Sequence, residues 1–551
     1  MLLTSLFAQA RALCRARGKS GRGSRAVLKR PGGRRATFER LEVREVLSSF
    51  NPIPGVVVTS IGAATSDWAP ASFLDSATGN IVVAGQSSGS TKSGAYRNLA
   101  VLRYQGNGVL DPSFGTGGVV TTQFQCLDSP RINAQSEAQG VAAYSGGRIV
   151  AAGYASQALT FGANFALARY TSTGSLDSTF NYQQVNKRSA TYGTQQTDLG
   201  GNDVIHGVVV QPDGKIVAGG VSGGLSNPAP AGFALARYTS TGQLDTSFNG
   251  TGIVKTPQLL GETASSLSDV TMQQGKILAV GYAHDPNGAY NDDFALARYN
   301  DNGTLDGTFG SGGVVITNHA GEDWAYAVAV YPSGAYQDDI VVAGSAARAD
   351  NPGVSTFAVA RYTPSGSLDA SFGGGIVETG TFGAWYSVAI QPDGRIVACG
   401  VNNQYSGPNG ISVARYNTDG SLDTSFGAGT GMVTTAIPNL AARPSSVLVQ
   451  ADGKIVVTGW ATDAASRRYI LLARYNALGN LDTTFGDPPA GKSVASPAAL
   501  TEAAFADASR QHLALGAAML QYEEQLQSKR PDDKQSRAIP AIDLALLDLA
   551  I

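Results

Sequence analysis

The sequence is poor in the residues that most often carry chemistry. Its 551 residues include three cysteines and four histidines, and only 15% of the chain is charged. Cys126 and Cys399 are too far apart for a disulfide framework or a zinc motif, and Cys14 lies near the N-terminus. No apolar run reaches the roughly 18 residues of a membrane span. We therefore expect no cofactor, no metal site and no membrane-spanning helix.

Glycine and hydrophobic residues are abundant. The chain has 68 glycines, and 43% of its residues are hydrophobic. Such a hydrophobic fraction can build a core and argues against a disordered chain. Frequent glycine together with Val, Ile, Thr and Tyr is typical of short strands joined by tight turns. The composition therefore predicts an all-β protein.

The charges are divided unevenly along the chain. Residues 1–44 hold twelve Lys or Arg and two acids, whereas the whole chain has a net charge of −2, so the remainder carries −12. An acidic body argues against a nucleic-acid partner, because such binding needs a basic surface. A short basic block is typical of a leader or tail outside the packed fold.

Internal repetition is the strongest feature of the sequence. The segment FALARY and its variants occur seven times, 54 to 68 residues apart. In every copy the Arg is followed by Gly after five residues, by Asp after eight and by Phe after eleven. The seven Arg–Asp pairs are Arg103 and Asp111, Arg169 and Asp177, Arg237 and Asp245, Arg298 and Asp306, Arg361 and Asp369, Arg415 and Asp423, and Arg474 and Asp482. Such a fixed unit predicts a repeat architecture.

The constant spacing predicts a hairpin in each unit. In the second unit, a three-residue loop at 172–174 would place its glycine in the left-handed conformation. Tyr170 would then lie opposite Leu176, and Arg169 opposite Asp177. We interpret the seven Arg–Asp pairs as structural. The alternative is a ring of seven arginines or aspartates that lines a channel and binds a ligand.

Each unit contains enough strands for one propeller blade. In the third unit, Gly207–Gln211, Lys215–Gly219 and Phe233–Tyr238 are predicted strands. A fourth begins near Leu244 or at Gly252–Thr256. The third strand should be buried on both faces, because large residues alternate with small ones instead of with polar ones. Four strands per unit is the composition of a β-propeller blade.

Two stretches resemble known families. The unit A-R-Y-x-x-x-G-x-L-D-x-x-F-G, preceded by P-D-G-K-I-V-x-x-G, resembles the delta-60 repeat of bacterial exported and surface proteins, over about residues 55–486. This resemblance implies a β-propeller-like array and no particular activity. Arg40–Ser48 (RLEVREVLS) resembles the N-terminal export segment of many planctomycete proteins. It implies an extracellular, cell-surface or periplasmic location, whereas the alternative is a disordered basic tail.

The ends of the repeat array predict ring closure. Six units end in a strand after the Phe, although the strand after Phe180 is degenerate, and the seventh unit lacks one. An orphan copy stands at Gly55–Ser60, before the first unit. We therefore predict a seven-bladed β-propeller of four-stranded antiparallel blades, closed by this N-terminal strand near residues 481–486. Residues 1–50 would be a leader, 51–492 the propeller and 493–551 a helical tail that packs on it, lies loose, or binds a partner or the cell envelope.

Function is less well defined by the sequence than architecture. We expect a monomeric, exported, non-enzymatic scaffold that binds protein or glycan through its variable loops. These loops are Leu225–Pro230, Asp285–Asp293, Ala347–Ser355 and Asn402–Asn409. One alternative is an extracellular glycan-cleaving hydrolase or lyase, and another is a structural surface module without a ligand. The enzyme's acids would come from Glu322, Asp323, Asp292 and Asp293, beside an exposed Trp324 or Trp385.

Overall fold

The computed structural model consists of β-strands joined by turns and loops. It describes residues 48–50, 52–61, 66–91, 94–129, 132–158, 162–186, 189–223, 232–256, 259, 264–284, 292–348, 351–402 and 410–486. Within these ranges all the regular secondary structure is strand, and no helix there could cross a membrane. The helical tail predicted for 493–551 and most of the leader predicted for 1–50 lie outside the described residues.

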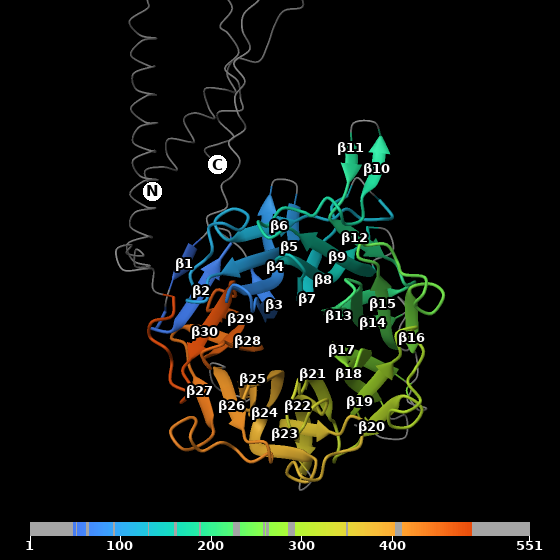
Figure 1. Cartoon of the computed structure of the whole chain (residues 1–551). Coiled ribbons are helices and arrows are strands. Elements are labelled where there is room, and N and C mark those ends of the chain that lie inside the picture. Colours follow the sequence, from blue (N-terminus) through green and yellow to red (C-terminus); the bar gives the residue numbers. More distant parts are fainter. Residues whose placement is uncertain are drawn as a thin grey trace, which may run out of the picture. The chain divides into compact units, whose positions relative to one another are not determined.

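Seven antiparallel blades surround a common axis, one for each sequence repeat, and blades 5 and 6 are joined into one sheet by a shared strand (Figure 1). Blade 1 contains β3 (Trp68–Leu74), β4 (Ile81–Thr91), β5 (Gly94–Tyr104) and β6 (Val119–Thr122). Blade 2 contains β7 (Ser136–Tyr144), β8 (Arg148–Ser156), β9 (Ala163–Tyr170) and β12 (Thr194–Thr197). Blade 3 contains β13 (Asn202–Val210), β14 (Ile216–Gly223), β15 (Gly232–Tyr238) and β16 (Ile253–Thr256).

The remaining four blades follow the same order, with the first strand of each nearest the axis (Figure 1). Blade 4 contains β17 (Ala264–Gln273), β18 (Lys276–His284), β19 (Asp292–Tyr299) and β20 (Val314–Thr317). Blade 5 contains β21 (Trp324–Val330), β22 (Ile340–Arg348), β23 (Asn351–Tyr362) and the first part of β24 (Ile376–Ile390). Blade 6 contains the rest of β24, β25 (Ile396–Asn402), β26 (Ile411–Tyr416) and β27 (Met432–Thr435). Blade 7 contains β28 (Leu440–Val449), β29 (Ile455–Asp463), β30 (Arg468–Tyr475), β2 (Val56–Ser60) and β1 (Ser48–Phe50).

The N-terminal strand closes the ring, as predicted. β2 pairs antiparallel with β30, with Val57 opposite Leu472. The predicted partner near 481–486 is wrong, because those residues form a turn and Gly55 merely lies against Leu481 there. The physical reason is that the outer strand of every blade pairs with the third strand, which in blade 7 is β30. β1 extends the same sheet, so the sheet begins within the segment predicted as leader.

Repeated hydrogen bonds between blades explain the Tyr of each Arg-Tyr pair. In six blades this Tyr hydroxyl lies 2.6–3.0 Å from a Thr hydroxyl in the outer strand of the preceding blade. In blade 6 the bond of Tyr416 is instead to Trp385 Nε1. One of the six, from Tyr104 of blade 1 to Thr59 of β2, crosses the closure of the ring. The chain's first strand is therefore joined to its neighbouring blade like any other outer strand.

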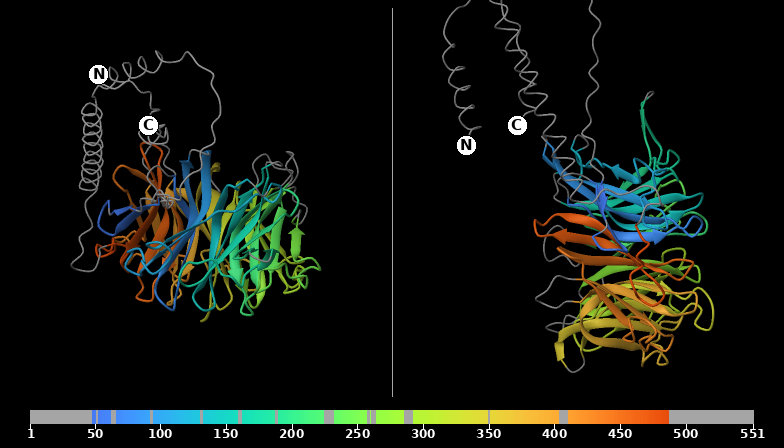
Figure 2. Two further views of the ribbon diagram at one scale, coloured as in Figure 1. Left: turned by 90° about the horizontal axis from the view of Figure 1, so that it is seen from above. Right: turned by 90° about the vertical axis from the view of Figure 1, so that its left-hand side faces the viewer.

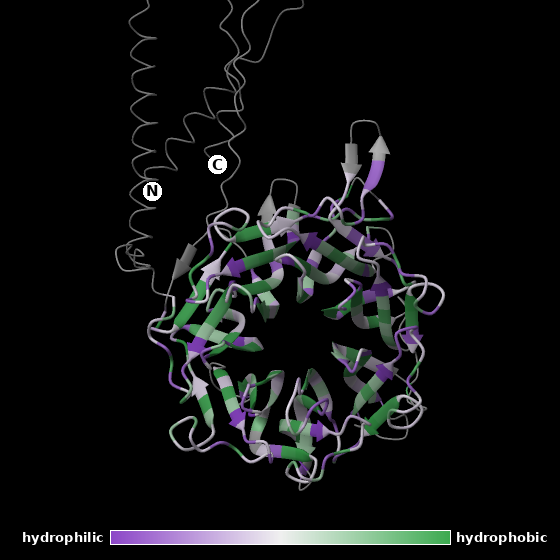
Figure 3. Ribbon diagram, viewed as in Figure 1, coloured by the Kyte–Doolittle hydropathy of each residue, from purple (hydrophilic) through white to green (hydrophobic). Residues whose placement is uncertain are grey.

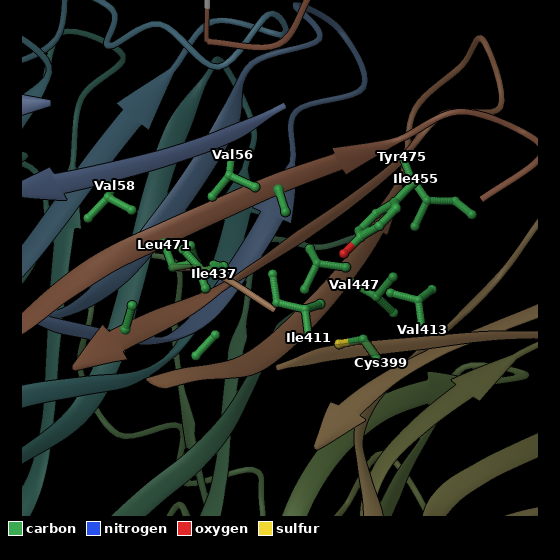
Figure 4. Close-up of a cluster of buried hydrophobic side chains, with 14 of the residues drawn as sticks. Val56, Val58, Cys399, Ile411, Val413, Ile437, Val447, Ile455, Leu471 and Tyr475 are labelled. Atoms are coloured by element: carbon green, nitrogen blue, oxygen red, sulfur yellow. The ribbon is translucent and has the colours of Figure 1, made fainter. Parts of the chain in front are cut away.

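Hydrophobic packing between blades fills the core. β9 is buried over its whole length, and Phe165 and Leu167 pack against blade 3, while Ala168 and Tyr170 pack against blade 1. The prediction of a third strand buried on both faces is thus confirmed. Figure 3 shows hydrophobic residues along the strands of every blade. Cys399 lies fully buried among aliphatic side chains of blades 6 and 7 (Figure 4).

The fourth strand differs from expectation in blade 2. In blade 3 it is β16, the later of the two predicted positions, and Leu244 forms only a single bridge to Tyr238. In blade 2 the residues after Phe180 leave the sheet as a separate hairpin of β10 (Gln183–Asn186) and β11 (Ser189–Thr191). This hairpin stands out from the ring (Figure 2). The outer strand is β12, which pairs with β9 only after the chain returns.

Candidate binding site in the axial channel

The repeated Arg and Asp residues lie together in every blade. Each Arg Nε is 2.7–3.1 Å from Oδ2 of the Asp eight residues later. Each Nη1 also donates to a backbone carbonyl of the next blade at 2.5–2.7 Å, and the last of these bonds, from Arg474 to Gly106, joins blade 7 to blade 1. The guanidinium carbon lies 4.5–4.8 Å from the centre of the repeated Phe ring. We call this Arg–Asp–Phe arrangement the interblade latch.

The hairpin that forms the latch has the predicted geometry in blade 2. Tyr170 bridges to Leu176, and Gly174 has a φ of +87°. Burial raises the pKa of the seven latch aspartates, but hydrogen bonds from a nearby Ser or Thr and from cationic side chains outweigh it, so each pKa lies below its ordinary value. The latch nitrogens are committed to protein acceptors, which favours the structural interpretation over a ligand-binding ring.

A second repeated feature lies at the axis, where every innermost strand carries a β-bulge. The pairing of the first with the second strand shifts register at the same point in all seven blades. A bulge redirects the side chain of the extra residue. The bulged residues are Pro70, Gln139, His206, Ser268, Tyr326, Tyr386 and Ser445.

A glycine accompanies each bulge. It is the last residue of the P-D-G-K-I-V-x-x-G pattern, and a Cβ there would lie 1.9–2.2 Å from a carbonyl oxygen of the first strand. The seven glycines are Gly85, Gly153, Gly220, Gly281, Gly344, Gly400 and Gly459. Only glycine allows this approach of the two backbones. The repeated glycine is the sequence signal that could have located the axial bulges, which our sequence reasoning missed.

The bulged side chains line one cavity at the centre of the propeller. Its volume is about 660 Å³, and all seven bulged residues contribute to its wall. Asp269, Tyr282, Arg443 and Trp460 also line it. The wall therefore combines aromatic rings with amide, hydroxyl and imidazole groups.

Aromatic residues form two groups at and near the wall of this cavity. In blades 4 to 6, the ring of Trp324 lies 6.1 Å from Tyr282 and 6.3 Å from Tyr326, which lies 5.3 Å from Tyr386. Between blades 7 and 1, Trp68 and Trp460 meet edge to face. The variable loops connect the second strand of a blade to the third. They therefore lie at the face of the ring where the first strand begins and the second strand ends. Three of the four predicted binding loops lie largely outside the described residues. The prediction of a loop at Ala347–Ser355 is wrong, because these residues extend β22 and β23, which pair Ala347 with Ser355.

Asp323, one of the acids proposed for an enzyme, is held by hydrogen bonds to the backbone. Asp323 is buried and accepts the amides of His319 and Ala347 at 2.7 and 2.9 Å. Asp67 and Asp203 accept backbone amides at the equivalent position of blades 1 and 3, which indicates a structural role for the carboxylate.

Asp292 lies beside Asp323 and accepts its amide through the backbone carbonyl, but neither residue lines the cavity. Asp292 accepts Trp324 Nε1 at 2.7 Å, and Asp293 is buried. Glu322 is half-buried. Trp385 is completely buried and stacks on Phe357 with ring centres 3.9 Å apart, so the expectation that it is exposed is wrong. Among the described lining residues of the cavity, Asp269 is the one carboxylate.

Burial sets the protonation of the channel groups. It raises the pKa of Asp269 to about 6. The backbone amides of Val328 and Val270 donate to this carboxylate at 3.1 and 2.8 Å and lower the pKa, but burial outweighs them. Burial also lowers the pKa of His206, so its imidazole is neutral at pH 7. Within the part of the chain that the structure describes, no three His, Cys, Asp or Glu side chains are grouped to hold a metal ion.

The fold and its seven latched units define a repeat β-propeller protein. Seven segments match the family model described as "Domain of unknown function (DUF5122) beta-propeller". The matched segments are residues 77–114, 147–180, 211–248, 275–309, 338–372, 391–426 and 450–485. No curated protein matches the sequence.

Solved structures with low sequence identity are similar in fold. One is a protein of unknown function from Dyadobacter fermentans, with 13% identity, a TM-score of 0.37, and coverage of 61% of this chain and 93% of that one. Another is the β-propeller domain of the Trilobed protease from Pyrococcus furiosus, with 10% identity, a TM-score of 0.38, and coverage of 78% and 98%. A third is polysaccharide lyase Uly1, with 12% identity, a TM-score of 0.42, and coverage of 72% and 88%. Function must be argued from the site of this chain.

Proposed function

We propose that the protein is an exported, delta-60-type binding scaffold that holds a carbohydrate in its axial channel without cleaving it. The observation that carries this proposal is the set of seven bulges at one level of the ring, which turn aromatic and polar side chains into a single cavity. The resemblance of Arg40–Ser48 to an export segment supports a location outside the cytoplasm, where extracellular glycans are found.

The chemistry of the wall fits a saccharide. A sugar presents C–H groups on its ring faces and hydroxyl groups around its edge. The rings of Tyr326, Tyr386 and Trp460 offer apolar faces, while Gln139 and Ser268 offer hydrogen-bonding groups beside them. A volume of about 660 Å³ lies within the range of ligand pockets.

The acids of the site favour binding over hydrolysis. Glycoside hydrolysis needs two carboxyl groups about 5–10 Å apart beside the scissile bond. Asp269 is the one carboxylate of the described wall, and it accepts two backbone amides. Asp323 and Asp292, proposed for the enzyme, hydrogen-bond to backbone amides and to Trp324 Nε1.

The test is a panel of neutral and acidic hexasaccharides, screened on an array and then titrated by calorimetry, with product analysis in parallel. Tyr326→Ala should weaken binding at least tenfold, because it removes a ring from the channel wall. Tyr182→Ala is the matched control, since Tyr182 is 54% exposed and lies beside the β10–β11 hairpin outside the cavity. It should leave affinity unchanged.

Three results would contradict the proposal. Binding that survives Tyr326→Ala would place the ligand elsewhere, such as on the variable loops. Shortened or unsaturated products would establish the hydrolase or lyase alternative. Absence of binding across the whole panel would favour a protein ligand or a purely structural surface module.

A further inference from the structure

Two arginines at the seam between blades 7 and 1 differ from the latch arginines. Arg443, near the start of β28, has its guanidinium carbon 5.9 Å from the ring centre of Trp460. Arg468, at the start of β30, lies 5.6 Å from the ring centre of Trp68. The two Trp rings meet edge to face with centres 4.9 Å apart. The four side chains thus form one group, which we call the seam cluster.

The cations of the seam cluster are exposed and have no carboxylate partner among the described residues. Arg467, next along the chain, is instead neutralised by Asp463, whose Oδ2 lies 2.8 Å from Nη2. A guanidinium held over an aromatic ring keeps its orientation while its N–H donors stay available. Arg443 and Trp460 also line the axial cavity, so these donors adjoin the proposed carbohydrate site.

We propose that the seam cluster is a subsite for an acidic sugar, one that bears a carboxylate or a sulfate group. This inference rests on the proposed carbohydrate function and specifies its ligand class. A sugar ring on Trp460 would place an anionic substituent near Arg443, whose planar fork matches a carboxylate or sulfate with two hydrogen bonds. Arg468 adds a second positive charge beside Trp68. An uncharged sugar gains only the stacking contact.

The experiment uses the full chain and chemically matched probes. A hexamer of galacturonic acid is titrated by calorimetry against its carboxyl-reduced, neutral counterpart, and a sulfated heparin hexasaccharide against its desulfated form. The wild type should bind at least one acidic probe at least tenfold more tightly than its neutral counterpart, and this preference should fall with rising salt. Arg443→Gln should abolish most of the preference, because it should lower the affinity for the acidic probe far more than the affinity for the neutral probe.

Arg467→Gln is the matched control, because its arginine lies in the same blade and its charge is already neutralised by Asp463. It should keep the preference. Equal affinity for charged and neutral probes, or equal loss in both variants, would overturn the acidic subsite and leave the carbohydrate function standing. Failure of all probes and of the neutral panel to bind would instead overturn the carbohydrate function itself.

Discussion

Replacing Asp369 by alanine tests whether the interblade latch stabilises the ring. Asp369 Oδ2 accepts Arg361 Nε at 2.7 Å, and its Oδ1 accepts the amide and hydroxyl of Ser371. The side chain of Arg361 is completely buried, and its Nη1 donates to the carbonyl of Thr418 in blade 6. The substitution therefore leaves a buried cation without its counter-charge.

The expected loss of stability is about 3 kcal/mol. Removing one partner of a buried ion pair costs about 3–5 kcal/mol, and we take the lower end because the Asp369 side chain is 16% exposed. Asp393→Ala is the matched control. Asp393 forms a similar pair with Arg395 at 2.9 Å, but the two side chains are 52% and 40% exposed. A solvent-exposed pair of this kind contributes about 1 kcal/mol or less.

Urea unfolding at pH 7, followed by tryptophan fluorescence, measures both losses. The pH dependence supplies a second readout. The pKa of folded Asp369 lies below its ordinary value of 3.8, so its contribution is fully present above that pH and is lost as the pH falls through the folded pKa. The gap between wild type and Asp369→Ala should therefore narrow in acid. Equal effects of Asp369→Ala and Asp393→Ala would refute the reasoning.

Two further predictions concern the channel wall. Gly400→Ala should cost at least about 2 kcal/mol in thermal or urea unfolding, because its Cβ would lie 1.9 Å from the carbonyl oxygen of Ala384, whereas Gly307→Ala, with open space around it, should have little effect. The pKa of Asp269 is about 6 in the folded protein and about 3.8 in the unfolded chain. Between these pH values the folded state therefore holds one more proton than the unfolded state. The free energy of unfolding should fall by at most about 3 kcal/mol as the pH rises from 4 to 7. Asp269→Asn should flatten this slope in melts across that range, and an unchanged slope would contradict the assignment.

Much of the ring could be predicted from the sequence, because its determinants are local and repeated seven times. The offset between Arg169 and Asp177 defines a hairpin whose bridge and left-handed glycine the structure contains. The orphan strand at Gly55–Ser60 predicted closure, because one unit lacked a strand that six others had. Its partner was misplaced, since the sequence does not reveal that outer strands pair with the third strand.

The axial site could not be predicted in the same way. The bulges depend on how two backbones approach each other, and the residues at the bulge, such as Pro70, His206 and Tyr326, differ between blades. Asp323 was proposed as a catalytic acid because its loop had no recognised match in the other repeats. Its buried position and its backbone partners became evident only beside the equivalent Asp67 and Asp203.

Closure of the ring by the chain's own first strands is the central claim, and thermal unfolding of two shortened proteins tests it most directly. One lacks residues 1–47 and retains β1 and β2; the other lacks residues 1–60 and loses both. The second loses the pairing of β2 with β30 and the Tyr104–Thr59 hydrogen bond. We predict that the first melts like the full chain, and that the second melts at a much lower temperature and loses saccharide binding. Equal melting temperatures for the two shortened proteins would contradict a ring closed by β2.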